Sequence, residues 1–223
     1  ARTLSPLAQC DGAALTLLRT ASVTAAMLQK LKVAESPKVA VFGSGPQALA
    51  HILAAREISN PSEVSIFARN QQSCAELIAG LALEGIDASV GTPAKLAEAD
   101  LIITATTARS PLFSLSEIKP DCVIAAVGSH EASAREIGSD VVRVSQVFIE
   151  EHDACLREAG DIVLALLDQS IAEESLIEVR DLFFGAEGQD QIEAKDSGIR
   201  FYKSTGMPWQ DLAIFAEAFK ILK

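Results

Sequence analysis

The residues best suited to chemistry form the glycine-rich loop Gly43-Ser44-Gly45-Pro46-Gln47-Ala48. The loop follows the apolar segment KVAVF and opens a segment with helical spacing, which is the context of a dinucleotide-binding turn. Gly43 permits a tight turn, Gly45 lets the backbone approach a pyrophosphate, and Ala48 allows the helix to pack closely on the strand. The N-terminus of that helix supplies positive potential for phosphate groups. These six residues are predicted to bind a dinucleotide, and the alternative is a tight turn that binds nothing.

The residues at the end of the next apolar segment indicate whether the site prefers NAD or NADP. A site that prefers NAD usually carries Asp or Glu there, to accept hydrogen bonds from the ribose hydroxyls. This sequence has Phe67-Ala68-Arg69-Asn70 instead, so no acidic residue is present. Arg69 could pair with a 2′-phosphate through its fork of donors, with Asn70 beside it. The sequence thus favours NADP, with NAD possible, and the alternative is a solvated Arg69 that caps the next helix.

Alternating apolar and helical segments must position these residues. The spacing predicts a long helix over 13–31, a break at Glu35-Ser36-Pro37, and further helices over 47–58 and 71–83. Short runs rich in β-branched residues predict six strands, at 38–43, 63–69, 86–90, 100–106, 121–128 and 146–150. Strands buried on both faces and separated by helices predict an α/β fold with a doubly wound parallel sheet.

The regular alternation of predicted strands and helices ends after Glu150. Residues 159–184 are predicted to be mostly helical, and 185–197 to form a polar loop. One more strand is expected at 198–204, and a final amphipathic helix at 209–222.

Composition excludes several classes of protein. Apolar residues make up 49% of the 223 residues, which is enough to form a core and rules out a disordered chain. Thirty acidic against nineteen basic residues give a net charge of −11, so nucleic acids and anionic membranes are poor partners. No apolar run reaches the roughly 18 residues that a bilayer span needs. The four scattered cysteines lack metal-ligand spacing, which predicts buried thiols in a reducing, cytoplasmic compartment without a metal site. These cysteines are Cys10, Cys74, Cys122 and Cys155.

Six segments, taken together in order and spacing, resemble the ornithine cyclodeaminase/mu-crystallin family. They are CDGAALTLLRTASVTA, VFGSGPQA, ADLIITATTARSPLF, AAVGSHEASARE, VFIEE and FYKSTGMPWQDLA. The resemblance implies a Rossmann dinucleotide-binding domain over 33–200. Residues 1–32 and 201–223 would belong to a second, α+β domain for dimerisation and substrate binding. Family members carry a further segment before the position of Ala1, so the resemblance implies that most of this second domain is missing here. The full-length protein is expected to be a homodimer.

The resemblance also assigns roles to individual residues. Arg19 matches the arginine that grips the substrate carboxylate, a task that suits a planar cation with two parallel donors. Thr205 lies in a Ser-x-Gly signature near the nicotinamide and the substrate, with Gly206 in a backbone conformation that other residues avoid. The remaining positions match residues that line the dinucleotide: Thr104, Thr106, Val127, Gly128, Ser129 and Ser204. For Val127, Gly128 and Ser129 the alternative is an ordinary turn, and for Arg19 an exposed helical arginine.

His130 departs from the family pattern. Ornithine cyclodeaminase has an acidic residue at this position, where it is thought to serve proton transfers around the amino groups. Its loss argues against ornithine deamination, whereas histidine can donate a proton near neutral pH. The resemblance thus implies His130 as a catalytic proton donor, and the alternative is a surface histidine in a loop.

These observations predict an NAD(P)H-dependent reductase of a cyclic imine carboxylate, such as pyrroline-2-carboxylate or piperideine-2-carboxylate. Arg19 would orient the small-molecule substrate, and His130 or a water molecule would protonate the imine nitrogen. The alternatives are ornithine cyclodeaminase, which forms proline and ammonia, and a non-catalytic module that binds a dinucleotide or a small ligand.

Overall fold

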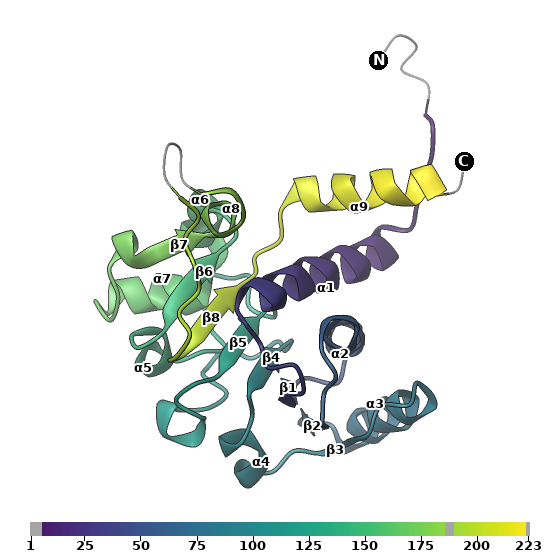
Figure 1. Cartoon of the computed structure of the whole chain (residues 1–223), viewed down its shortest axis with the longest axis horizontal. Coiled ribbons are helices and arrows are strands. Elements are labelled where there is room, and N and C mark those ends of the chain that lie inside the picture. The colour runs from purple at the N-terminus through teal and green to yellow at the C-terminus, as the bar shows by residue number, and fades with distance from the viewer. Residues whose placement is uncertain (1–5, 186–189, 222–223) are drawn as a thin grey trace.

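A computed structural model describes residues 6–185 and 190–221, and its centre is an eight-stranded parallel sheet (Figure 1). The strand order is β3-β2-β1-β4-β5-β8-β6-β7, and every pair is parallel. The strands are β1 (Lys38–Phe42), β2 (Glu63–Phe67), β3 (Ala88–Val90), β4 (Leu101–Thr104), β5 (Val123–Ala126), β6 (Gln146–Ile149), β7 (Leu176–Glu178) and β8 (Arg200–Lys203). The predicted α/β class with a doubly wound parallel sheet is confirmed.

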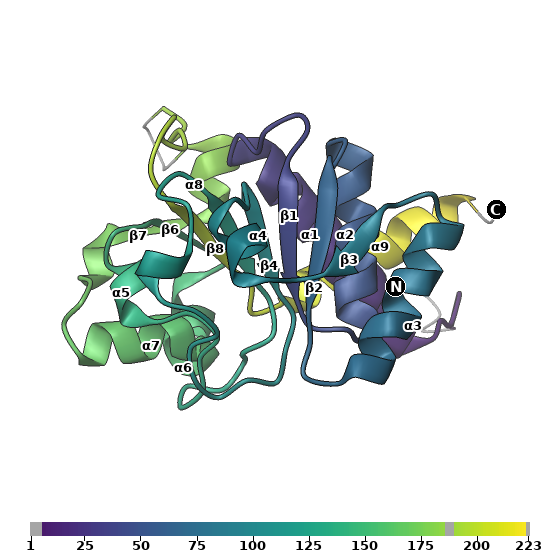
Figure 2. The same cartoon turned by 90° about the horizontal axis from the view of Figure 1, so that it is seen from below.

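Helices cover both faces of the sheet, as Figures 1 and 2 show. On one face lie α1 (Gly12–Lys30), α2 (Pro46–Ile58), α3 (Gln71–Leu83) and α8 (Val179–Phe184). On the other face lie α4 (Pro93–Ala97), α5 (Ser139–Val142), α6 (His152–Glu158) and α7 (Gly160–Leu167). The central strands β4, β5 and β8 are buried along their whole length, because each packs against helices on both sides. Within the described ranges, no helix is long and apolar enough to cross a membrane.

The local sequence explains where the helices begin. The Asp11 side chain accepts a hydrogen bond from the Ala14 N–H and caps α1, and Pro46 begins α2. The Asn70 side chain accepts from the N–H groups of Gln72 and Ser73, which fixes the start of α3. The predicted helix over 71–83 therefore matches α3.

The second half of the chain differs from the prediction in several places. Helices α5 and α6 lie where no helix was predicted. Residues 176–178 form the short edge strand β7 within a segment predicted to be mostly helical. The predicted strand at 198–204 corresponds to β8, which lies between β5 and β6 in the sheet. The predicted domain boundary at 200/201 thus falls inside β8. Part of the predicted polar loop, residues 186–189, lies outside the described residues.

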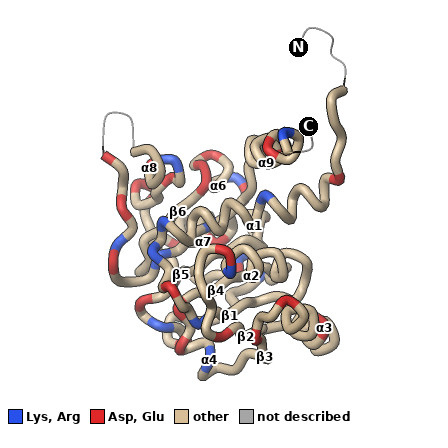
Figure 3. Tube along the Cα trace, turned by 45° about the vertical axis from the view of Figure 1, so that its right-hand side comes forward, with Lys and Arg blue, Asp and Glu red and all other residues tan. Residues whose placement is uncertain are grey.

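Helix α9 (Pro208–Ile221) leaves the sheet after β8 and lies beside α1 (Figure 1). Gln210 is the one fully buried residue of its described part. Acidic and basic residues are interspersed along the described part of the chain (Figure 3). Residue Leu222, the last of the predicted final helix, lies outside the described residues.

Cysteine burial follows the prediction at three of four positions. Cys74, Cys122 and Cys155 are buried, and burial raises the pKa of the Cys122 and Cys155 thiols to about 12. Cys10 is exposed, so the prediction of a buried thiol is wrong there: residues 6–14, which lead into α1, are all exposed. No group of His, Cys, Asp and Glu residues in the described part of the chain is arranged to hold a metal ion.

Candidate functional site

The glycine-rich loop makes the turn that its sequence predicts. Gly43 has a φ of +118°, and a Cβ there would lie 2.5 Å from the carbonyl oxygen of Ala105. Its N–H donates to the carbonyl oxygen of Phe67 at 2.9 Å, so the loop passes close over the ends of β2 and β4. A Cβ on Gly45 would meet open space, whereas Ala48, in the first turn of α2, is fully buried. This arrangement leaves the N-terminus of α2 accessible to a ligand.

The end of β2 places two predicted cofactor-binding residues at the surface. Arg69 is exposed and makes no hydrogen bond or ion pair with a described residue. Asn70, not Arg69, provides the side-chain cap of α3, so the alternative of a capping Arg69 is excluded. Ser44 of the glycine-rich loop lies 2.7 Å from Ser73 Oγ, which links the loop to the first turn of α3. Arg69 is therefore free to contact a ligand at this corner.

A buried carboxylate joins the loops after β4 and β5. Glu136 is fully buried and accepts four hydrogen bonds, from Thr104 Oγ1 at 2.8 Å, Thr106 N at 2.8 Å, Thr106 Oγ1 at 2.7 Å and Gly128 N at 2.8 Å. The hydroxyls of Thr104 and Thr106 point to this carboxylate. A Cβ on Gly128 would collide with Thr106 and with Glu136, so glycine is required for the approach. The sequence analysis missed Glu136, although it lies within the segment AAVGSHEASARE.

A second buried group, formed by Lys203 and Asp161, contacts the same loops. Lys203, at the end of β8, is fully buried with its Nζ 3.0 Å from Asp161 Oδ2 and 2.5 Å from the carbonyl oxygen of Ser129. Asp161 Oδ1 in turn accepts from the N–H groups of Glu136 and Ile137 at 2.7 and 2.8 Å. A buried ion pair needs additional hydrogen bonds to be stable. Here these bonds go to the backbone of Ser129, Glu136 and Ile137, and they hold that backbone in place.

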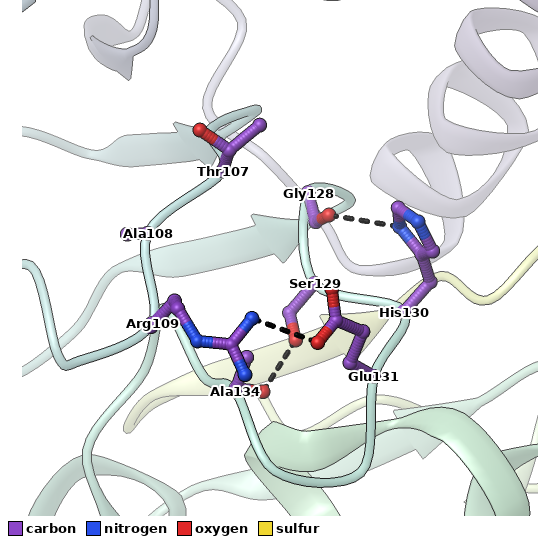
Figure 4. A pocket seen from close by; sticks show the side chains of 8 residues that line it. All are labelled: Thr107, Ala108, Arg109, Gly128, Ser129, His130, Glu131 and Ala134. Carbon is purple, nitrogen blue, oxygen red and sulfur yellow. Dashed lines mark hydrogen bonds and ion pairs between the residues drawn. The ribbon is translucent and has the colours of Figure 1, made fainter.

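His130 lies at the edge of a small pocket beyond β5 (Figure 4). The pocket has a volume of about 60 Å³ and is lined by residues 107–109, 128–131 and 134. The exposed His130 ring lies with Nδ1 3.2 Å from the carbonyl oxygen of Gly128. Across the pocket, Arg109 pairs with Glu131 at 2.8 Å. Such a volume holds water molecules.

Arg19 lies against the turn that follows β8. Its side chain is 15% exposed, and Nη1 donates to Gln210 Oε1 at 3.0 Å. Its Nε lies 3.5 Å from Asp211 Oδ1, while no described residue accepts a hydrogen bond from Nη2. Gly206, with a φ of +83°, packs directly on the guanidinium, since a Cβ there would lie 2.5 Å from Nη1. The result is a half-enclosed cation with donors left for a carboxylate.

The turn after β8 is organised by Glu150, at the end of β6. Ser204 and Thr205 both donate to its carboxylate, through Ser204 Oγ at 3.1 Å, Thr205 N at 3.0 Å and Thr205 Oγ1 at 3.2 Å. Tyr202 Oη donates to the same group at 2.7 Å. Burial and the Glu150 carboxylate raise the pKa of Tyr202 well above its usual value, so the phenol stays neutral and donates. Neither Glu150 nor Gln210 was singled out from the sequence.

Apart from Arg19, which lies on α1, the predicted site residues lie at or just beyond the carboxyl ends of parallel strands. Gly43 follows β1, Thr104 ends β4 and Thr106 lies just beyond it, Gly128 follows β5, and Ser204 follows β8. In an open parallel sheet, ligands bind at this edge, where the strand order reverses, which here is between β1 and β4. The open space at Gly45 and the free N-terminus of α2 fit the pyrophosphate of a dinucleotide.

Comparisons with known proteins agree with this geometry. The chain is 27% identical over 216 residues to the Delta(1)-pyrroline-2-carboxylate reductase of Colwellia psychrerythraea, a match that covers 95% of this chain and 67% of that protein. It is 29% identical over 208 residues to the ketimine reductase mu-crystallin of Mus musculus, covering 93% of this chain and 63% of that protein. The chain thus spans about two thirds of the length of these relatives.

A solved structure gives the same result. The Thermococcus litoralis Delta(1)-pyrroline-2-carboxylate reductase, in complex with NADH and L-proline, superposes with a TM-score of 0.88 and 25% identity. The superposition covers 98% of this chain and 68% of that one. These findings confirm the predicted fold and the predicted class, an NAD(P)-dependent oxidoreductase. The model of the ornithine cyclodeaminase/mu-crystallin family matches residues 2–219, nearly the whole chain, and the protein therefore belongs to that family.

Proposed function

We propose that this protein uses NAD(P)H to reduce a cyclic imine that carries a carboxylate next to the C=N bond, such as pyrroline-2-carboxylate. The observation that carries the proposal is the half-enclosed Arg19 guanidinium, whose Nη2 has no acceptor in the described part of the chain. Arg19 touches Gly206, three residues beyond the end of β8, at the same sheet edge as the glycine-rich loop. A carboxylate held there would lie near the site expected for the nicotinamide.

Arg19 and His130 would have separate roles in the reaction. The bound dinucleotide supplies a hydride for the imine carbon. Arg19 would hold the substrate carboxylate through charge-assisted hydrogen bonds and so fix the orientation of the ring. His130, or a water molecule in the adjacent pocket, would protonate the imine nitrogen, because an iminium accepts hydride far better than a neutral imine.

The finer assignments are part of the same proposal. Residues 43–48, Arg69 and Asn70 would bind the dinucleotide, with Arg69 favouring the 2′-phosphate of NADP. The ends of β4 and β5 would line the nicotinamide half. Buried thiols are typical of reducing compartments, which supports a cytoplasmic location for the protein. The full-length protein would act as a homodimer.

The test mixes the purified full-length protein with 1-pyrroline-2-carboxylate and either NADPH or NADH. Loss of nicotinamide absorbance with formation of proline is expected. Formation of proline and ammonia from ornithine, without net oxidation of nucleotide, would instead identify a cyclodeaminase. Tight binding of nucleotide without turnover of either substrate would identify a binding module and contradict the proposal.

A further inference from the structure

The starting observation is the number of donors that converge on one carboxylate. Glu150 is 8% exposed and accepts six hydrogen bonds from the segment 202–210. Three of them come from the turn itself, through the N–H groups of Thr205 and Gly206 and the Thr205 hydroxyl. A carboxylate with this many partners is rigid, because any rotation would break several charge-assisted bonds at once.

Gln210 connects that carboxylate to Arg19. Its Nε2 donates to Glu150 Oε1 at 3.0 Å, and its Oε1 accepts from Arg19 Nη1 at 3.0 Å. The same Oε1 also accepts from the Met207 N–H at 3.2 Å. Because Gln210 is 1% exposed, water cannot easily replace these bonds. Its amide therefore has a single orientation, with the nitrogen toward Glu150 and the oxygen toward the arginine.

The other contacts of the Arg19 guanidinium leave its Nη2 without an acceptor among the described residues. Gly206 covers the guanidinium, and the Asp211 carboxylate lies 3.5 Å from Nε. Gln210 occupies Nη1. The donors of Nη2 are left for a ligand, so the orientation of the arginine decides where a substrate carboxylate can bind.

We infer that Gln210 is a positioning residue that orients Arg19 for the substrate carboxylate, with Glu150 as its rigid anchor. This inference rests on the proposed role of Arg19 in the reduction of an imine carboxylate. It assigns to α9 a direct part in substrate selection, because its third residue fixes the arginine supplied by α1.

The primary test is the variant Gln210→Met, which keeps the length of the side chain and removes all three hydrogen bonds of its amide, to Glu150, Arg19 and Met207. The KM for 1-pyrroline-2-carboxylate should rise about ten- to a hundredfold and kcat should fall, since a misplaced reactant loses near-attack geometry. The dissociation constant for NADPH should stay within about twofold, because Gln210 lies outside the glycine-rich loop. The matched control is Gln191→Met, whose Nε2 donates to the carbonyl oxygen of Phe183 on an exposed surface. It should behave as the wild type.

A second measurement does not depend on turnover. In the protein labelled at arginine, NMR exchange spectra report the rotation of the Arg19 guanidinium about its Nε–Cζ bond. Rotation should be slow in the wild type and in Gln191→Met, and fast in Gln210→Met.

The outcomes separate the two proposals. Wild-type protein that binds NADPH but reduces no imine would defeat the proposed function, and the NMR comparison would still decide the role of Gln210. Equal rotation rates in wild type and Gln210→Met, or an unchanged KM, would overturn the inference. An equal loss of NADPH affinity and of imine turnover would also overturn it, because that pattern indicates a general structural role.

Discussion

Glu136 accepts a hydrogen bond from the backbone N–H of Gly128 at 2.8 Å, and through this bond a fully buried carboxylate ties the end of β5 to the end of β4. The same carboxylate binds Thr104 and Thr106 on β4 and the loop that follows it. Two loops that would flank the nicotinamide therefore have one common support. Its removal should affect stability and cofactor binding together.

The variant Glu136→Gln tests this support. An amide in place of the carboxylate turns an acceptor oxygen into an NH₂ group that faces donors, so at least one buried group loses its partner. The free energy of unfolding in urea should fall by about 1–3 kcal/mol. Glu57→Gln, at an exposed position on α2, should change it by less than about 0.5 kcal/mol. A stable Glu136→Gln variant with normal NADPH affinity would show that the loops do not need this carboxylate.

His51 predicts how stability depends on pH. Its ring is buried between α1 and α2, with Nδ1 2.8 Å from the carbonyl oxygen of Gln47 and Nε2 3.0 Å from Thr24 Oγ1. Burial lowers the pKa of His51 from 6.5 to about 4, although the Gln47 contact opposes the shift. Its contribution to stability is therefore present above pH 6.5 and is lost as the pH falls toward 4. A shift of this size corresponds to about 3 kcal/mol.

The measurement is the free energy of unfolding at pH 7 and at pH 4.5. His51→Gln, which cannot titrate in this range, should reduce the difference between the two values by roughly 2–3 kcal/mol. His130→Asn, at an exposed ring, is the control and should retain the wild-type difference. An unchanged difference in His51→Gln would mean that other groups cause the loss of stability in acid.

Arg69 is expected to select NADPH over NADH. A charge-assisted contact with the 2′-phosphate is worth about 1.5–3 kcal/mol, so Arg69→Ala should lower the affinity ratio of the two nucleotides about ten- to a hundredfold. Fluorescence titration with both nucleotides gives the ratio. Arg143→Ala, an exposed arginine just past α5, provides the control for a lost positive charge. The same ratio in Arg69→Ala and wild type would exclude Arg69 from selection.

Gly206→Ala tests the contact between the turn after β8 and the substrate arginine. The new Cβ would lie 2.5 Å from Arg19 Nη1, so the guanidinium must move and the KM for the imine should rise at least tenfold, in line with the cost of misplacing a bound reactant. Gly198→Ala is a matched control, because its φ of +87° gives the same backbone strain while the Cβ meets open space. A similar KM in both variants would remove Gly206 from substrate binding.

His130 can be tested as the proton donor by His130→Asn. Loss of a general acid should lower the rate of imine reduction about a hundred- to ten-thousandfold and abolish the fall in rate at alkaline pH. A wild-type rate and pH profile would leave His130 as a loop residue. In the companion variant His130→Asp, ornithine deamination would show that this one position separates the two activities of the family.

The sequence predicted the parts of the molecule that depend on local patterns. The strand and helix periods and the Gly43 turn each follow from residues that are close together in the sequence, and the structure agrees with them. The Asn70 cap of α3 was not predicted, because Asn70 was assigned to the cofactor. β7 was missed because Leu176–Glu178 is a three-residue edge strand next to a helix, too short for its period to show. The place of β8 in the sheet depends on contacts with β5 and β6, which no local pattern encodes.

Some residues of the candidate site were singled out from the sequence, and others were not. The glycines and Arg19 were predicted because their chemistry is distinctive and their segments resemble a family, and their roles stay predictions. Glu136, Glu150 and Gln210 were missed, since each acts on groups far away in the sequence: Gln210, for example, lies 191 positions from Arg19. A polar residue in the sequence does not reveal that it will be buried, and only the fold determines which donors surround it.

The position of β8 also constrains how the chain can fold. β5 and β6 do not pair with each other, and each pairs with β8 instead. During synthesis both strands therefore keep an unpaired edge until residues 200–203 have emerged, although β6 ends at Ile149. The first five strands in the sheet and the pair β6-β7 must form as separate blocks that a late strand joins. Such long-range closure slows folding and leaves the edges of β5 and β6 open to wrong pairing until β8 has emerged.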